Sequence, residues 1–159
     1  MAWDLITHAT ALIAVLTTAV VYGTDVFCAI VLRPALAMVD DRALAAVTGN
    51  VHSYGDRRMP VPGGIGICAT AVTAVLAAVT AHWAQAGAAA VALVSLLVWI
   101  ALYTKVSAPI NRQLTAAADA GQVLPNVRVL QAQWDRIIDV RAALQGLALT
   151  ALCVALVIG

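Results

Sequence analysis

The stretch LITHATALIAVLTTAVVYGTDVFCAIVL, residues 5–32, decides the fold of this chain. Its side chains are mostly apolar, and about 20 such residues in a helix suffice to cross the ~30 Å hydrocarbon core of a bilayer. The segment before it carries Asp4 and no basic residue, which is not the pattern of a secretory signal peptide. We therefore predict that residues 5–32 form a membrane-spanning helix of the mature protein.

The overall composition also indicates a membrane protein. The 159 residues are 63% hydrophobic and 11% charged, whereas an ordinary soluble domain is about 45–50% apolar and about 25% charged. This composition excludes a typical soluble enzyme, a disordered chain and a nucleic-acid-binding protein. Three further apolar runs cover residues 63–82, 88–106 and 142–158. We predict an all-α, integral membrane four-helix bundle in which residues 1–159 form a single transmembrane domain.

The charged residues are confined to two segments. All nine basic residues lie between the first and second spans or around the connection between the third and fourth spans. By the positive-inside rule, both connections face the cytoplasm, and both termini lie outside the inner (plasma) membrane. Seven of the eight acidic residues, all of them aspartate, follow the same partition, and Asp4 is the exception. Polar chemistry is therefore expected at the cytoplasmic end of the bundle.

The first connection, residues 33–59, is expected to contain a short amphipathic helix. Pro34 should bend or end the spanning helix nearby. Asp40 and Asp41 are good N-cap residues for a helix that ends between residues 50 and 54. Leucine and valine residues recur within it at helical spacing, which gives the helix one apolar face.

The second connection, residues 107–140, is expected to contain a helix of the same kind after Pro109. Gly121 and Pro125 interrupt the segment. A further helix should begin near Asn126 and continue without a break into the fourth span.

A first candidate site lies near the end of the first connection. His52 and Asp56 are four residues apart, so their side chains can touch if the segment is helical. An aspartate can orient an imidazole for proton transfer, which makes both residues catalytic candidates. The adjacent Arg57 and Arg58 are placed to bind an anionic oxygen of a phenolate or enolate. The alternative is that these arginines only contact anionic lipid headgroups.

Asp25 is a second candidate because it lies inside the first span. It precedes Arg33 by eight residues, which places it roughly 12 Å deeper along a regular helix. A carboxylate at that depth usually faces a cavity, the bundle interior or a cationic partner. The alternative is that Asp25 sits at the interface and forms a structural pair with Arg57 or Arg58.

Two residues of the second connection and the arginine that follows it complete the candidate site. Asn111 follows Pro109 and can cap a helix, Trp134 can belong to an interfacial aromatic belt, and Arg141 can snorkel from the start of the fourth span. Each has this ordinary explanation on its own. Because all three are expected at the same end of the bundle as His52, we predict that they line one pocket.

Metal and cofactor chemistry have weaker support in the sequence. His8 and His82 lie near the outer ends of the first two spans, which leaves open a haem or metal site between them. The three cysteines, at positions 28, 68 and 153, are isolated and form no CxxC pair, so structural burial is favoured over metal or disulfide chemistry. We predict no bound metal and no resident cofactor.

Five segments share a pattern that resembles a known family. They are Gly23–Phe27, Arg33–Leu36, His52–Pro60, Pro109–Asn111 and Trp134–Arg141. The pattern resembles the anthrone oxygenase-like family of small four-helix membrane proteins, which was defined as a domain of unknown function. The resemblance covers nearly the whole chain. Many members carry a histidine close to the arginine of the last segment, where this chain has Ile138-Asp139-Val140.

The resemblance implies a cofactor-independent oxidoreductase that acts on a hydrophobic aromatic substrate. Some members oxidise anthrones to anthraquinones with dioxygen. His52, supported by Asp56, would then be the base, and an arginine would hold the substrate anion. The arginine candidates are Arg57, Arg58 and Arg141, and the substrate-binding candidates are Asp25, Asn111 and Trp134.

Two functions of other classes remain open at this point. The chain can be a non-enzymatic bundle that binds lipid or a partner, including a second copy of itself, or a haem or metal carrier that uses His8 and His82. A transporter is less expected, because the sequence lacks two similar halves. In every case the expected surroundings are the lipid bilayer, with a hydrophobic small molecule as the ligand of the enzyme.

Overall fold

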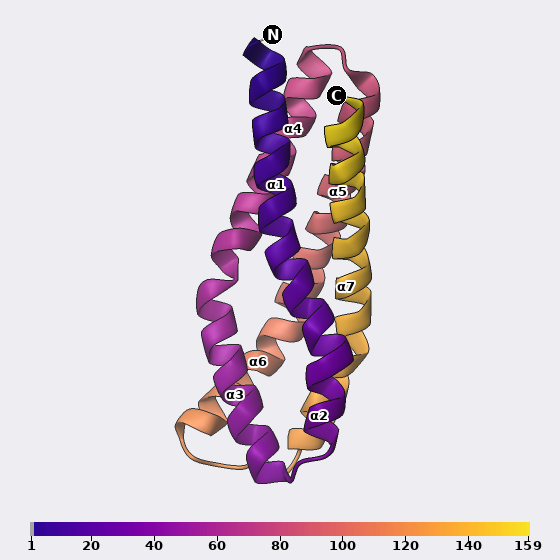
Figure 1. Cartoon of the computed structure of the whole chain (residues 1–159). Helices are drawn as coiled ribbons and strands as arrows, with labels where there is room; N and C mark the ends of the chain where they lie inside the picture. The colour runs from indigo at the N-terminus through magenta and orange to yellow at the C-terminus, as the bar shows by residue number, and fades with distance from the viewer. Residues whose placement is uncertain (1) are drawn as a thin grey trace. The chain divides into compact units, whose positions relative to one another are not determined.

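A computed structural model describes residues 2–159, and these residues are helical almost throughout, with no strand among them (Figure 1). This confirms the all-α fold. Four helical runs within this range are long and apolar enough to cross a membrane, namely Trp3–Ala37, Pro60–Val79, Trp83–Asp119 and Val127–Ile158. The helices are α1 (Ala2–Phe27), α2 (Arg33–Ala37), α3 (Asp41–Arg58), α4 (Pro60–Val79), α5 (Trp83–Leu102), α6 (Ala108–Asp119) and α7 (Val127–Ile158), with π-helical turns η1 (Cys28–Leu32) and η2 (Tyr103–Ser107).

The described chain divides into two compact units. The alanine-rich unit contains residues 2–23, 61–99 and 143–159, and the charged unit contains residues 24–60 and 100–142. All nine Lys and Arg residues and seven of the eight Asp residues belong to the charged unit, and Asp4 belongs to the other. His52 and every other predicted catalytic or substrate-binding residue also fall within the charged unit.

Small side chains fill the core of the alanine-rich unit. Ala14, Ala92 and Ala148 are fully buried and pack with Leu96 and Leu152. In lipid the hydrophobic effect does not drive helices together, so their association depends on close packing. Small residues allow the helix backbones to approach closely. A few polar bonds add to this packing, among them a bond of 3.0 Å from the Thr73 hydroxyl to the Thr10 hydroxyl and one of 3.0 Å from Gln85 Nε2 to the carbonyl of Ala155.

Larger side chains form the core of the charged unit, where α3 lies along α6 (Figure 1). Gly49 of α3 is the point of closest approach. A Cβ added to Gly49 would lie 2.7 Å from the carbonyl oxygen of Leu114 and would overlap the Cβ of Ala118. The hydroxyl of Thr115 donates to the carbonyl of Gly49 over 3.2 Å. The buried core residues are Cys28, Ala29, Leu36, Leu44, Ala45, Ile110, Leu114, Val127, Leu130, Trp134 and Ile138.

The two π-helical turns explain why proline ends neither of the long helices that contain it. Proline lacks an N–H and clashes with the carbonyl four residues back in a regular helix. Here Pro34 and Pro109 each follow a wider turn, in which Arg33 N–H bonds to Cys28 O and Ala108 N–H bonds to Tyr103 O. The helical runs therefore extend to Ala37 and Asp119. The predicted helix ends at 32 and 106 are corrected accordingly.

The structure bears out two other local predictions and corrects some boundaries. Asp40 is the N-cap of α3, and its Oδ1 accepts from the Ala43 N–H over 2.8 Å. Asp41 instead pairs with Arg128 over 2.7 Å. α3 continues to Arg58 rather than ending between residues 50 and 54, while α7 does run unbroken from Val127. The second and third spans also shift: α4 covers Pro60–Val79 and α5 begins at Trp83.

The close contact at Gly49 gives a first test of the charged unit. Replacing Gly49 by Ala should lower the free energy of unfolding by about 1–3 kcal/mol, because the backbone of α6 must move to admit a methyl group. Thermal unfolding of the purified protein in detergent measures the change. Gly55 of the same helix has no atom within 4 Å of an added Cβ, so Gly55→Ala is the matched control. The control should gain about 0.5–1 kcal/mol, and equal effects of the two changes would contradict the close contact.

Candidate functional site

Asp56 of α3 joins three helical segments of the charged unit. Its Oδ1 accepts a hydrogen bond of 2.7 Å from the Tyr103 hydroxyl, at the start of η2. The same oxygen accepts one of 2.8 Å from Asn111 Nδ2, on α6. A carboxylate oxygen with two donors is well satisfied, and bonds to a charged acceptor are stronger than neutral ones. Asp56 therefore fixes the positions of Tyr103 and Asn111.

Trp134 extends this network to α7. Its indole Nε1 donates to Asn111 Oδ1 over 3.0 Å. The indole ring also lies against the imidazole of His52, with 5.3 Å between ring centroids and an interplanar angle of 48°. Both rings are buried. His52, Asp56, Asn111 and Trp134 thus come together in one network, whereas the sequence predicted only that they share one end of the bundle.

Arg141 forms the second half of the site with Asp25. Arg141 Nη2 lies 2.8 Å from Asp25 Oδ1, and the two side chains are only 7% and 5% exposed. Arg141 Nη1 donates to the Ser107 hydroxyl over 2.9 Å. The interfacial pair of Asp25 with Arg57 or Arg58 is therefore wrong, because the cation that pairs with Asp25 is buried beside it on α7.

Arg141 also brings the two halves of the site together. Its guanidinium carbon lies 5.4 Å from the centre of the Tyr103 ring and 5.8 Å from the centre of the Trp134 ring. These distances are typical of cation–π interactions, and such interactions are stronger where water is excluded. Arg141 Nε is buried without a hydrogen-bond partner among the described residues.

His52 has an unusual environment for a titratable group. Its side chain is buried, and within residues 2–159 its Nε2 has no hydrogen-bond partner. The bonds of the Asp56 carboxylate go to Tyr103 and Asn111 rather than to the imidazole. Burial lowers the pKa of His52 to about 4; the Asp56 carboxylate opposes this shift and Arg141 adds to it. His52 is therefore a neutral imidazole at neutral pH.

Two predicted site residues do not join this network. Arg57 and Arg58 are both exposed. The guanidinium of Arg58 lies over the exposed ring of Tyr54 at 5.2 Å. Both side chains thus lie outside the buried network, and within it the described residues place the guanidinium of Arg141 against the Trp134 ring.

Sequence reasoning missed Tyr103 and Ser107. Both lie at the polar end of the third apolar run, where they are easily taken as the edge of the span. A signal was nevertheless present, because Tyr103, Ser107 and Asn111 follow one another at intervals of four residues. Side chains at that spacing share one face of a helix.

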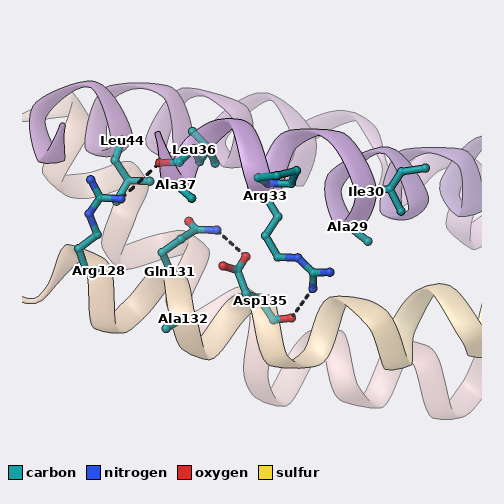
Figure 2. A pocket seen from close by; sticks show the side chains of 11 residues that line it. Ala29, Ile30, Arg33, Leu36, Ala37, Leu44, Arg128, Gln131, Ala132 and Asp135 are labelled. Carbon is teal, nitrogen blue, oxygen red and sulfur yellow. Dashed lines mark hydrogen bonds between the residues drawn. The ribbon is translucent and has the colours of Figure 1, made fainter. Parts of the chain in front are cut away.

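A cleft of about 490 Å³ lies elsewhere in the charged unit, and none of the predicted catalytic or substrate-binding residues lines it (Figure 2). Its walls come from the end of the first helical run, from α3 and from the start of α7. It is lined by Ala29, Ile30, Arg33, Pro34, Leu36, Ala37, Leu44, Arg128, Gln131, Ala132 and Asp135.

The histidines and cysteines with possible metal chemistry belong to the alanine-rich unit, except for Cys28. His8 Nδ1 lies 2.7 Å from the carbonyl of Asp4, and His82 Nδ1 lies 2.9 Å from the Thr80 hydroxyl. Over the part of the chain that is described, no group of three His, Cys, Asp or Glu residues could hold a metal ion. Cys28 is buried, but Cys68 and Cys153 are exposed, so the expected burial of cysteine is wrong for these two.

Comparison with known proteins identifies no relative. No protein-family model, no curated protein and no solved structure matches this chain. The chemistry of the site therefore rests on its own geometry.

The low pKa of His52 predicts a pH-dependent stability. The unfolded chain binds a proton at His52 below about pH 6.5, whereas the folded chain does so only near pH 4. The unfolded state is therefore favoured as the pH falls through this window, at a full cost of about 3 kcal/mol. Thermal unfolding in detergent at about pH 7 and about pH 4.5 measures the loss.

His52→Gln should reduce this pH dependence, since glutamine does not titrate. Carboxylates also titrate near the lower pH, so the quantity of interest is the difference between the parent protein and the variant. His82→Gln is the matched control, because His82 is exposed. An identical pH dependence in the parent and in His52→Gln would contradict the buried neutral imidazole.

Proposed function

We propose that this chain is a membrane-embedded oxidoreductase that acts on a hydrophobic aromatic substrate without a cofactor. The observation that carries the proposal is a neutral, buried imidazole with an unpartnered Nε2, at His52, in the same network as a buried guanidinium, at Arg141. The sequence resemblance to the anthrone oxygenase-like family implies the same chemistry, but no family model matches the chain, so the proposal rests on the geometry of the site. The substrate class is an anthrone or a related phenol.

The reaction begins with proton transfer. His52 Nε2 accepts a proton from the activated CH₂ group of the substrate, and the resulting carbanion is delocalised onto its oxygen. Arg141 stabilises that oxygen through its free Nε–H, in surroundings where water does not screen the charge. The carbanion then reduces dioxygen, the oxidant. In balance, the CH₂ group and O₂ give a carbonyl group and one molecule of water.

The surrounding residues position these two groups. The ring of Trp134 contacts His52 and offers a flat surface for an aromatic substrate. Asp56 acts through Tyr103 and Asn111, which it holds in place, and its negative charge favours the protonated imidazole that forms during the reaction. Asp25 orients the Arg141 guanidinium. Because His52 and Trp134 are buried, substrate binding requires the side chains over Nε2 to move apart.

The proposed location is the inner (plasma) membrane, with multiple spans. The basic residues favour a topology in which both connections are cytoplasmic and both termini are outside. An apolar substrate would then enter from the bilayer, which concentrates it next to the helices.

The proposal predicts a large loss of oxidation when the base is removed. Purified protein should consume dioxygen in the presence of anthrone, and His52→Gln should lower the rate by at least about 100-fold, the usual contribution of a general base. Oxygen uptake and quinone absorbance measure the rate. Arg136→Gln, a change at an exposed residue of α7, should leave the rate unchanged. Equal rates for the parent protein and His52→Gln, in folded samples, would reject the proposal.

A second candidate function is a non-enzymatic bundle that binds lipid or a partner. The buried Asp25–Arg141 pair favours it, since an ion pair of this kind can be purely structural. In either case Asp25→Asn should lower the free energy of unfolding by about 3 kcal/mol, because it leaves Arg141 buried without a counter-charge. Thermal unfolding of the variant measures this loss.

A double replacement separates the two candidates. Apolar side chains of similar volume often substitute for a buried ion pair at little cost, so Asp25→Leu with Arg141→Met should recover most of the stability. If the bundle is structural, binding of its ligand survives in the double variant. If the site is catalytic, oxidation is lost although the protein is stable.

A further inference from the structure

The cleft in the charged unit contains hydrogen-bonding groups that the protein leaves unused. Figure 2 shows Arg33 extending from α2 toward Asp135 on α7, and Gln131 of α7 bonded to the same aspartate. Gln131 is 7% exposed, and its Oε1 is buried with no hydrogen-bond partner in the described structure. An unsatisfied buried acceptor of this kind costs about 1–3 kcal/mol, so its retention points to a ligand.

Asp135 provides a second acceptor beside Gln131. Gln131 Nε2 donates to Asp135 Oδ1 over 2.8 Å, which orients the amide. Asp135 lines the cleft, and no residue within 2–159 donates to its Oδ2. The last torsion of a glutamine side chain is broad, so a small rotation presents Oε1 to a donor placed at Asp135. Together the two residues form a site for a group that carries several N–H donors and a positive charge.

The two arginines of the cleft differ in their free donors. Arg128 uses Nε on Asp41, Nη1 on the carbonyl of Leu36 and Nη2 on the carbonyl of Val39, so its guanidinium is occupied by the protein. Arg33 uses only Nη1, which bonds to Asp139 Oδ2 at 2.9 Å and to the carbonyl of Asp135 at 3.4 Å. Arg33 Nε and Nη2 thus remain for an anion.

The apolar side of the cleft continues onto a membrane-spanning segment. Ile30 lines the cleft and is 68% exposed. It belongs to the helical run Trp3–Ala37, which is apolar enough to cross a bilayer. A ligand with an ammonium group, an anion and hydrocarbon chains therefore matches the three parts of the cleft.

We propose that this cleft binds the headgroup of a primary-amine phospholipid, such as phosphatidylethanolamine. The ammonium group donates to Gln131 Oε1 and Asp135, the phosphate accepts from Arg33, and the acyl chains lie along the surface that contains Ile30. A choline headgroup lacks N–H donors and cannot make the first contact. The site is separate from His52, so the proposal does not depend on the oxidation chemistry.

Native mass spectrometry of the delipidated full chain in detergent tests the proposal. Dioleoyl phosphatidylethanolamine should bind about tenfold more tightly than dioleoyl phosphatidylcholine, the ratio expected for a bond to a charged donor. Gln131→Leu should abolish most of this preference. Gln133→Leu is the matched control, since Gln133 is exposed two residues away on the same helix, and it should preserve the ratio.

A second variant covers the case in which Gln131→Leu does not fold. Asp135→Asn keeps an oxygen for the Gln131 bond but removes the negative charge, and it should also reduce the preference for the amine headgroup. An equal affinity for the two lipids would overturn the proposal, as would a preference that survives both changes. Binding of soluble glycerophosphoethanolamine as tightly as the lipid would rule out a lipid ligand.

Discussion

The buried ion pair between Asp25 and Arg141 is the interaction on which the charged unit depends. Removing one charge from water costs several kcal/mol, and a partner with good geometry offsets that cost. The pair can be buried only if the first and last long helices meet at these two residues. Arg141 also contacts Ser107, Tyr103 and Trp134, so the same guanidinium fixes η2 and α7 relative to the pair.

Most hydrogen-bond donors and acceptors around this ion pair are matched to one another. Asp56 takes donors from Tyr103 and Asn111, and Asn111 in turn takes the indole N–H of Trp134. Buried polar atoms that lack a hydrogen-bond partner are therefore informative. His52 Nε2 and Gln131 Oε1 are buried atoms with no hydrogen-bond partner in the described chain, and they belong to separate parts of the unit. One lies in the network of aromatic rings and the other beside the cleft.

The sequence predicted what depends on composition and on helical spacing. Apolar runs predicted the four long helices, and the cap at Asp40 followed from a local side-chain preference. The scarcity of polar residues in an apolar chain predicted that His52, Asn111, Trp134 and Arg141 share one end of the bundle, but it did not predict their contacts. The length of the first and third helical runs was not predictable in this way, since proline normally signals an end and the wider turns at η1 and η2 remove its clash.

The details of pairing also required the structure. Arg57 and Arg58 are adjacent to Asp56 in sequence, but α3 turns them to its exposed face, whereas Arg141 comes from a distant segment. Gln131 and Asp135 gave no signal in the sequence, because a four-residue spacing of two polar residues on a helix is common. Their meaning comes from the burial of one amide oxygen of Gln131 without a hydrogen-bond partner in the described structure, beside Asp135.

The wide turns η1 and η2 have a consequence for changes in chain length. A π-helical turn holds one residue more than an α-helical turn, so it is equivalent to a single-residue insertion absorbed on the spot. Deleting a residue elsewhere in such a helix turns all later side chains by about 100° and would separate Arg141 or Asp56 from their partners. Deleting one within η1 or η2 would keep the faces in phase and would instead restore the clash at Pro34 or Pro109. Pro34 and Pro109 thus make the loss of the extra residue at η1 or η2 unfavourable.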